Sequence, residues 1–138
     1  MKYMDSCVII GSYFPDDPNH EVCKSFMDNL VEGEFECVIS IFGLAEIGGF
    51  ISRNSNPELA KKFTQELLDL PNLHIVYVSG FENFMNSVLL VSVLKGLSGA
   101  DAIHLVSALS SVEVDEFVTV DHDFNRVSDM IRVTNLRK

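Results

Sequence analysis

The chain is poor in cysteine and in long apolar runs, and these shortages exclude several classes of protein. Its three cysteines are widely spaced and form no CxxC pair, which argues against a zinc site and indicates free thiols in a reducing cytoplasm. The longest strongly apolar segment, residues 88–94, is far shorter than the ~20 residues that a membrane span requires. The amino terminus lacks the basic region and long apolar stretch of a secretion signal. We therefore expect a cytoplasmic protein without a membrane partner.

Positive charge is also scarce. Lysine and arginine number 10 against 20 aspartates and glutamates, which gives a formal net charge of −10. This balance argues against a protein that holds nucleic acid through broad charge attraction alone. It does not exclude a nuclease, because bound cations and local basic residues can supply the attraction. An acidic surface also suits a basic protein partner.

Linkers, repeats and low-complexity stretches are absent from the sequence. With 138 residues, 47% of them hydrophobic, the chain predicts a single globular domain over residues 1–138. Apolar spacing and turn residues predict strands that alternate with helices, a pattern typical of a parallel sheet covered on both faces. The strands are expected over residues 2–5, 36–40, 74–78, 116–120 and 131–134, and the helices over residues 20–31, 42–53, 57–69, 81–94, 100–109 and 123–127, with a helical turn at Ser6.

Four acidic residues lie inside or beside apolar runs, where a soluble domain rarely places a charge: Asp5, Glu46, Asp101 and Asp121. A carboxylate removed from water costs several kcal/mol unless it is paired or bound to a metal. The nearby sequence offers too few cations to pair all of them. In parallel α/β sheets ligands bind at the carboxyl ends of the strands, where Asp5 and Asp121 are expected to lie. We therefore predict that the fold gathers the four acids around a divalent metal.

Each acid also has a purely structural explanation. Asp5 could cap the helical turn that follows it. Asp101, in the first turn of its helix, is favoured there by the helix dipole. Glu46 could be an exposed residue near a helix end, and Asp121 and Asp123 could lie in a solvated turn. The four acids together favour a metal site more strongly than any one of them does.

The donor atoms indicate which metal such a site would hold. Carboxylate oxygens suit Mg²⁺ or Mn²⁺, whereas zinc prefers cysteine and histidine ligands, which are not clustered in this sequence. Close carboxylates repel one another, so the pKa of some of them should be raised in the metal-free protein. A divalent cation relieves this repulsion, activates water and stabilises a phosphate leaving group.

Four segments resemble the motifs of the PIN-domain ribonucleases, and in particular those of the VapC-like toxins of toxin–antitoxin pairs. The segments are residues 3–10 with Asp5, residues 39–47 with Glu46, residues 99–105 with Asp101 and residues 117–124 with Asp121. They span the whole chain in the order expected for the family. The third and fourth together are fairly specific, while the first alone is not.

The resemblance implies a three-layer α/β/α PIN-like fold with a central, mainly parallel sheet. It also implies an endoribonuclease, dependent on Mg²⁺ or Mn²⁺, that hydrolyses RNA phosphodiesters. The acids that would catalyse this reaction and bind the metal are Asp5, Glu46, Asp101 and Asp121. Asp123 would be an auxiliary metal ligand, and the hydroxyls of Ser6 and Thr119 would orient the carboxylates. Toxins of this type also imply a homodimer and an antitoxin partner.

Two other roles remain open: a housekeeping PIN nuclease in RNA maturation or decay, and a catalytically inactive PIN-fold interaction module. The presence of all four acids argues against the inactive module. A phosphotransfer hydrolase with an early aspartate nucleophile is disfavoured. Such enzymes usually need a second aspartate two positions after the first, where this chain has Cys7.

Basic and histidine side chains near the motifs are few. The cations available to bind RNA are Lys2, Arg53, Lys95 and Arg126. We therefore expect weak RNA binding, or a groove that a dimer completes. His104 falls in the middle of a predicted helix and is interpreted as a packed core residue. His122 could contact RNA or lie exposed in its turn.

Overall fold

The computed structural model describes residues 1–137, which form five strands, six α-helices and one 3₁₀ helix. Their order is β1 (Lys2–Met4), α1 (Ser6–Tyr13), α2 (His20–Val31), β2 (Cys37–Ser40), α3 (Ile41–Asn54), α4 (Pro57–Leu68), β3 (Leu73–Val76), α5 (Phe81–Lys95), α6 (Gly99–Leu109), β4 (Glu116–Thr119), η1 (His122–Val127) and β5 (Arg132–Asn135). The predicted alternation of strands and helices is confirmed. The predicted domain of residues 1–138 includes Lys138, which lies outside the described residues, and its extent stays a prediction.

The strands form one sheet in the order β3-β2-β1-β4-β5, and every neighbouring pair is parallel. The predicted parallel sheet is therefore confirmed. The chain begins on the central strand β1, extends the sheet to one side through β2 and β3, and then adds β4 and β5 on the other side. Ligands of parallel α/β sheets bind where the strand order reverses in this way, outside the carboxyl ends of the strands. The fold thus makes the carboxyl ends of β1, β2 and β4 the expected position of a site.

The side chains of the strands alternate between two apolar cores, one on each face of the sheet. Tyr3 and Phe117 lie in one core with residues of α5 and α6. Met4 and Val118, the next residues along the same strands, lie in the other core with residues of α1 to α4. All four side chains are fully buried, as expected for strands that are covered on both faces. The predicted three-layer arrangement is confirmed.

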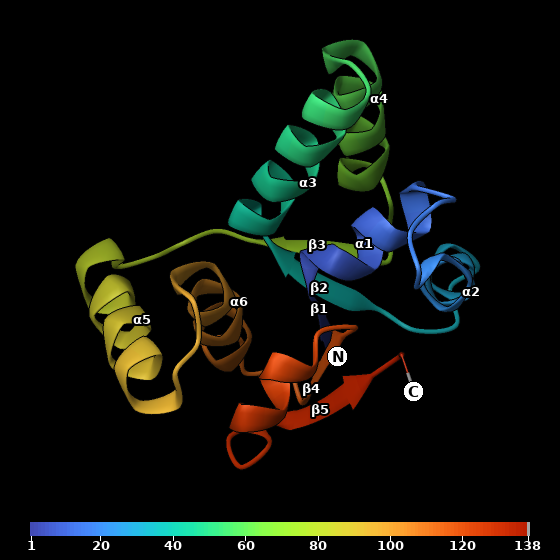
Figure 1. Cartoon of the computed structure of the whole chain (residues 1–138). Helices are drawn as coiled ribbons and strands as arrows, with labels where there is room; N and C mark the ends of the chain where they lie inside the picture. Colours follow the sequence, from blue (N-terminus) through green and yellow to red (C-terminus); the bar gives the residue numbers. More distant parts are fainter. Residues whose placement is uncertain (138) are drawn as a thin grey trace.

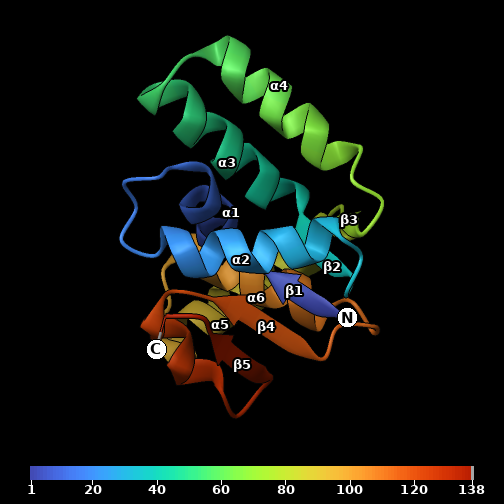
Figure 2. The ribbon, with the colours of Figure 1, turned by 90° about the vertical axis from the view of Figure 1, so that its right-hand side faces the viewer.

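Figure 1 shows α1 and α2 on one side of the sheet and α5 and α6 on the other. Helices α3 and α4 pack against each other and project beyond α1 and α2, as Figure 2 shows. Helix α4 begins at Pro57 after Asn56, whose side chain accepts a hydrogen bond from Leu59 N. Helix α6 begins after Ser98, whose hydroxyl accepts one from Asp101 N. This second cap fixes the start of the helix that carries a predicted catalytic acid.

Two elements differ from the prediction by more than one residue at an end. The helical turn expected at Ser6 is a helix of eight residues, α1. None of these residues is exposed, so the sequence has no polar helix face that would mark its length. The strand expected over residues 74–78 ends early, since the neighbouring strand β2 gives way to α3 after Ser40. Tyr77 and Val78 leave the sheet and are 64% and 38% exposed.

Among the described residues, no single helix is long and apolar enough to cross a membrane. Helices α5 and α6 reach that length and composition only when taken together, and the chain bends by 116° between them.

Candidate active site

The carboxyl ends of β1 and β4 bring two of the predicted acids to neighbouring positions. Asp5 directly follows β1, and Asp121 lies just beyond β4, the strand that pairs with β1. A hydrogen bond of 2.9 Å from Asp5 N to Val118 O continues the pairing up to the site. The Thr119 hydroxyl donates to Asp5 Oδ2 at 2.8 Å and accepts from Asp121 N at 2.9 Å. Thr119 therefore contacts a carboxylate and links the two loops that carry these acids.

Asp101 approaches the same point from α6. The hydrogen bond from Asp101 N to Ser98 Oγ caps that helix and fixes Asp101 in its first turn. One carboxylate oxygen from each of Asp101, Asp121 and Asp123 lies within 4.8 Å of the others. The Asp123 backbone N donates to Asp121 Oδ1 at 2.9 Å, which holds the third acid in place. These three aspartates, here named the carboxylate cluster, are three of the five predicted metal ligands.

The carboxylate cluster changes the acidity of one of its members. Burial, followed by the nearby charges of Asp5 and Asp121, raises the pKa of Asp101 to about 6. A raised pKa is the result expected for acids that repel one another without a metal. A divalent cation at this point would relieve the repulsion, because it favours the ionised form of each carboxylate.

Asp5 is held in a nearly buried position, with 6% of its side chain exposed. Asp5 occupies the N-cap position of α1, as its structural alternative expected, but its carboxylate makes no capping hydrogen bond to that helix. Its Oδ2 instead accepts hydrogen bonds from Thr119 Oγ1 and, at 3.1 Å, from Cys7 Sγ. Burial and the Asp5 charge raise the pKa of the Cys7 thiol, which therefore stays a neutral donor.

Glu46 reaches the site from α3 with 30% of its side chain exposed. Its Oε1 accepts a hydrogen bond from Ser6 Oγ at 2.9 Å and lies 2.6 Å from His104 Nε2. Ser6 therefore contacts a carboxylate, although it is that of Glu46 and not that of its neighbour Asp5. The sequence around Glu46 offers no residue that could neutralise its charge, and its partner His104 comes from α6.

His104 is the residue of the site that sequence reasoning missed. It is buried, as a core residue should be, with 1% of its side chain exposed, but it also lies between two of the predicted acids. Its Nε2 is 2.6 Å from Glu46 Oε1 and 3.7 Å from Asp5 Oδ1. Burial alone would lower the pKa of His104, yet the hydrogen bond with Glu46 and the nearby carboxylates raise it. The available signal was spacing, since a residue three places after Asp101 lies on the same helix face.

The donor set of the carboxylate cluster fits a hard divalent cation. Among the described residues, the group that could hold a metal consists of aspartates alone. Carboxylate oxygens are the ligands that Mg²⁺ and Mn²⁺ prefer, whereas a zinc site would need cysteine or histidine. Asp101, Asp121 and Asp123 would therefore hold the ion. Asp5 and Glu46 both approach Nε2 of His104, on the same helix as Asp101, at 3.7 and 2.6 Å.

The predicted RNA-binding cations are unevenly placed. Arg126 lies at the carboxylate cluster, where its Nη2 is 3.9 Å from Asp123 Oδ1. Lys95 is engaged in an ion pair on the surface. Lys2 begins β1, at the end of the strand away from the acids, and its Nζ lies 2.7 Å from Glu116 Oε1. Lys2 therefore lies away from the acids, and its part in RNA binding stays a prediction.

A change of Thr119 to valine should test the link between the two loops. Valine keeps the shape of the side chain but has no hydroxyl. It therefore loses both the hydrogen bond to Asp5 Oδ2 and the one from Asp121 N. We expect the free energy of unfolding, measured in urea, to fall by about 1–3 kcal/mol. Mn²⁺ affinity should fall about 10–100-fold. Thr119→Ser keeps the hydroxyl and should restore most of the affinity, so equal losses in the two variants would contradict this role.

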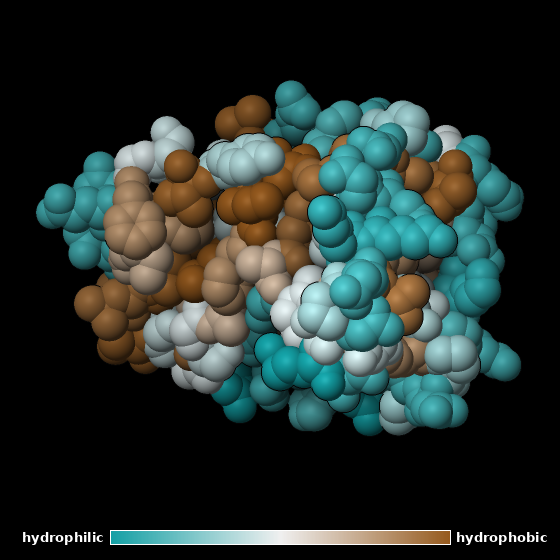
Figure 3. Space-filling view, turned by 90° about the horizontal axis from the view of Figure 1, so that it is seen from above, coloured by the Kyte–Doolittle hydropathy of each residue, from teal (hydrophilic) through white to brown (hydrophobic). Residues whose placement is uncertain are grey.

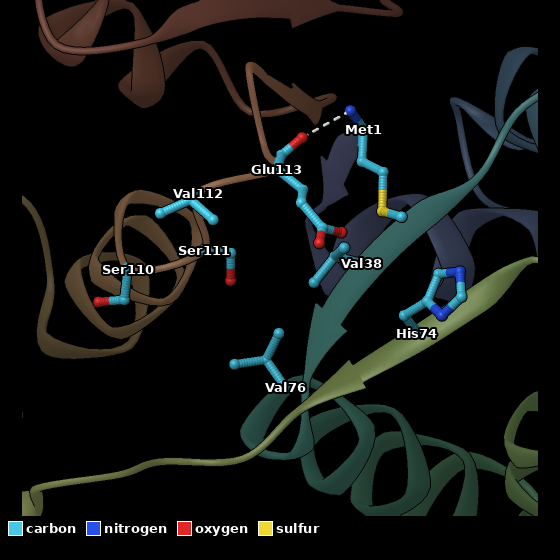
Figure 4. Close-up of a pocket in the computed structure, with 8 residues that line it drawn as sticks. All are labelled: Met1, Val38, His74, Val76, Ser110, Ser111, Val112 and Glu113. Atoms are coloured by element: carbon cyan, nitrogen blue, oxygen red, sulfur yellow. Dashed lines mark hydrogen bonds between the residues drawn. The ribbon is translucent and has the colours of Figure 1, made fainter.

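A separate cavity of about 400 Å³ lies beside the residues that precede β1 and β4. In Figure 4 Met1 and Glu113 lie together at this cavity, where the amino terminus donates a hydrogen bond of 2.7 Å to Glu113 O. Val38 and Val76 line it from the sheet. The predicted site residues are not among those that line this cavity, so it is distinct from the candidate active site.

Nearly the whole chain matches one family of proteins. The family model described as PIN domain matches residues 2–130. The chain belongs to the PIN domain family. The resemblance inferred from the four motifs is thus confirmed. The acids predicted to catalyse the reaction or bind the metal all lie within the matched range of this PIN domain. A comparison with curated protein sequences gives no match.

Solved structures that share the PIN fold include proteins of toxin–antitoxin pairs. VapBC-1 from nontypeable Haemophilus influenzae is 19% identical, with a TM-score of 0.69 and coverage of 100% of both chains. VapBC2 from Rickettsia felis, bound to a DNA fragment from its promoter, is 20% identical, with a TM-score of 0.67 and coverage of 98% of both chains. VapC20 from Mycobacterium tuberculosis, described as a toxin that cleaves the sarcin–ricin loop, is 12% identical, with a TM-score of 0.69. That match covers 85% of this chain and 87% of the other. At these identities the likeness shows a shared fold.

Proposed function

We propose that this PIN domain is a divalent-metal-dependent endoribonuclease that hydrolyses RNA phosphodiesters. The carboxylate cluster carries the proposal, because its three oxygens lie within 4.8 Å of one another at the carboxyl end of a parallel sheet. Bound Mg²⁺ or Mn²⁺ would supply an activated water and stabilise negative charge on the phosphate. Membership of the PIN domain family supports the same chemistry.

The protein's own side chains hold the carboxylates and the substrate for this reaction. Thr119 fixes the orientation of Asp5 through a hydrogen bond to Oδ2. Burial and the Asp5 charge raise the pKa of the Cys7 thiol, which disfavours this side chain as a nucleophile. Arg126, whose Nη2 lies 3.9 Å from Asp123 Oδ1, would contact a phosphate of the RNA backbone.

Cleavage of an RNA and of a DNA with the same sequence tests this function. With Mn²⁺ or Mg²⁺, wild-type protein should cut the RNA at internal positions and leave the DNA intact, and EDTA should stop the cutting. Cutting that persists in EDTA would contradict the metal dependence. Equal cutting of DNA would contradict an RNA substrate.

We further propose that the chain is the toxin of a toxin–antitoxin pair. The fold shared with VapBC-1 and VapBC2 supports this role, and the net charge of −10 suits a basic antitoxin segment. Expression of the wild type should then arrest bacterial growth, whereas expression of Asp101→Asn should not. Normal growth with an active enzyme would favour a nuclease of RNA maturation or decay.

The surface of α5 supports the proposal of a homodimer. Figure 3 shows apolar residues gathered at the end of the molecule where α5 lies. Four of them are each 57–72% exposed: Leu89, Leu90, Val93 and Leu94. Between Glu82 and Lys95 the helix has no charged residue. In a chain with net charge −10, two copies can meet on such an uncharged apolar face without repulsion.

Val93→Asp should convert this dimer to monomers. Val93 is 72% exposed, so the change leaves the core intact but places a charge in the contact face of each copy. Like charges brought together cost several kcal/mol, so the dissociation constant should rise by about 100-fold or more in sedimentation experiments. Val31→Asp, at an exposed valine of α2, is the matched control and should stay dimeric. A wild type that is monomeric at every concentration would contradict the dimer.

A further inference from the structure

His104 connects the core of the domain to one of the predicted acids. Its ring is 1% exposed, yet both ring nitrogens have polar partners. Nε2 lies 2.6 Å from Glu46 Oε1, and Nδ1 lies 2.8 Å from the hydroxyl of Tyr3. That hydroxyl also accepts a hydrogen bond from Ser40 N at 3.1 Å. A chain of hydrogen bonds therefore runs from the end of β2, through the core, to a carboxylate at the site.

The fold holds this imidazole in one position. Gly43 of α3 faces the ring, and a Cβ added there would lie 3.0 Å from His104 Cε1. The same Cβ would lie 2.8 Å from a side-chain carbon of Ile39, so a larger residue at Gly43 would displace the ring or the core. The rings of Tyr3 and Phe42 stand edge-on to the imidazole, each with its centroid 5.7 Å away. Glycine thus allows the ring to approach α3, and the aromatic neighbours fix its orientation.

The contacts on Glu46 use one of its two oxygens. Ser6 Oγ donates to Oε1, the same oxygen that lies against His104 Nε2. The side chain of Glu46 is 30% exposed, so its carboxylate lies at the boundary between the core and solvent. Contacts to Oε1 fix the rotation of the carboxylate and leave Oε2 for a ligand outside the core. Hydrogen bonds of this kind orient the carboxylates that bind metals.

We propose that His104 is a positioning residue, which together with Tyr3 directs the Glu46 carboxylate toward an ion held by the carboxylate cluster. This inference rests on the proposed function, because it requires the metal site. The residue at position 104 must then present a hydrogen-bond donor to Glu46, while the contact with Tyr3 serves to fix the ring.

Glutamine and asparagine at position 104 form a matched pair of variants. His104→Gln extends its amide to the place of Nε2 and keeps a donor for Glu46. His104→Asn is one methylene shorter, so its amide stays near the place of Nδ1. This variant keeps the contact with the Tyr3 hydroxyl and loses the contact with Glu46. Mn²⁺ affinity of the folded protein, measured by calorimetric titration, should fall about 10–100-fold in His104→Asn and stay within a few-fold of wild type in His104→Gln.

Leu105→Ala controls for a loss of packing, because Leu105 is a fully buried neighbour on α6. It should lower the melting temperature and leave Mn²⁺ affinity unchanged. Tyr3→Phe, which removes only the hydroxyl, tests the same chain of hydrogen bonds if His104→Asn does not fold. It keeps the imidazole donor to Glu46 and loses only the contact that fixes the ring, so its Mn²⁺ affinity should fall by a few-fold.

Wild-type affinity in His104→Asn or, where that variant does not fold, in Tyr3→Phe would overturn the positioning role. Equal losses in His104→Asn and His104→Gln, or an equal loss in Leu105→Ala, would also overturn it. A wild type that binds no Mn²⁺ would instead overturn the metal site, and the proposed function with it.

Discussion

Asp101→Asn is expected to abolish metal-dependent RNA cleavage while the fold stays intact. The change removes a charge that, with Asp121 and Asp123, would hold the ion, but it keeps the size of the side chain and the Ser98 cap. A bound divalent cation is worth several kcal/mol of transition-state stabilisation, so the cleavage rate should fall by about 10³-fold. Initial rates on an end-labelled RNA at neutral pH and fixed metal concentration measure this loss.

Asp129→Asn provides the matched control for that loss. Asp129 is an exposed aspartate whose partner is Lys95, and it lies outside the carboxylate cluster. This variant should cleave RNA at the wild-type rate. Equal rates for wild type and Asp101→Asn would show that Asp101 has no part in the reaction, and equal losses in both variants would indicate a general effect of charge.

Asp101→Asn should also make the metal-free protein more stable. The pKa of Asp101 is raised from 3.8 to about 6 on folding, so the folded state binds the proton more tightly than the unfolded state does. Stability of the metal-free wild type therefore falls as the pH rises from about 4 to about 6, and Asp101→Asn should remove this fall. Because Asp101 is partly exposed, we expect a gain of about 1 kcal/mol at neutral pH, well below what the full pKa shift implies.

Mn²⁺ or Mg²⁺ should raise the melting temperature of the wild type, and more so at neutral than at acidic pH. A ligand at about 100 times its Kd stabilises the folded state by about 2.7 kcal/mol, or roughly 8–10 °C for a chain of this size. The metal must displace the proton of Asp101, whose pKa is raised to about 6. Below that pH the apparent affinity should fall by about tenfold per pH unit. Thermal melts with equal metal at about pH 7.5 and about pH 5 measure the difference.

Asp101→Asn is the control for this pH dependence, and metal should raise its melting temperature little at either pH. An equal rise in the wild type at both pH values would count against the titration of Asp101. If metal produced no rise in the wild type at neutral pH, the metal site itself would be wrong.

Much of the fold could be predicted because its signals are local. Asn56 before Pro57 and the apolar spacing of residues 20–31 mark helices without reference to the rest of the chain. The length of α1 was not visible in this way, since none of its residues is exposed and the helix has no polar face. The end of β3 depends on where β2 ends, and no local pattern identifies that partner.

The acids of the candidate site could be named from the sequence, but their contacts could not. A buried charge is costly in any fold, so the apolar surroundings of Asp5 and Glu46 made them exceptional before their positions were known. Their partners come from distant elements. His104 meets Glu46 across 58 residues, and Thr119 meets Asp5 across 114. Spacing within α6 places His104 on the same helix face as Asp101, but no pattern within α3 or α6 identifies Glu46 as its partner.

The anomalous scattering of Mn²⁺ in crystals of the protein tests most directly whether the carboxylate cluster holds the catalytic ion. We expect a peak roughly 2 Å from carboxylate oxygens of Asp101 and Asp121. The peak should be lost in crystals of Asp101→Asn prepared with the same metal. A peak elsewhere on the chain, or none at a Mn²⁺ concentration that saturates binding in solution, would contradict the proposed site.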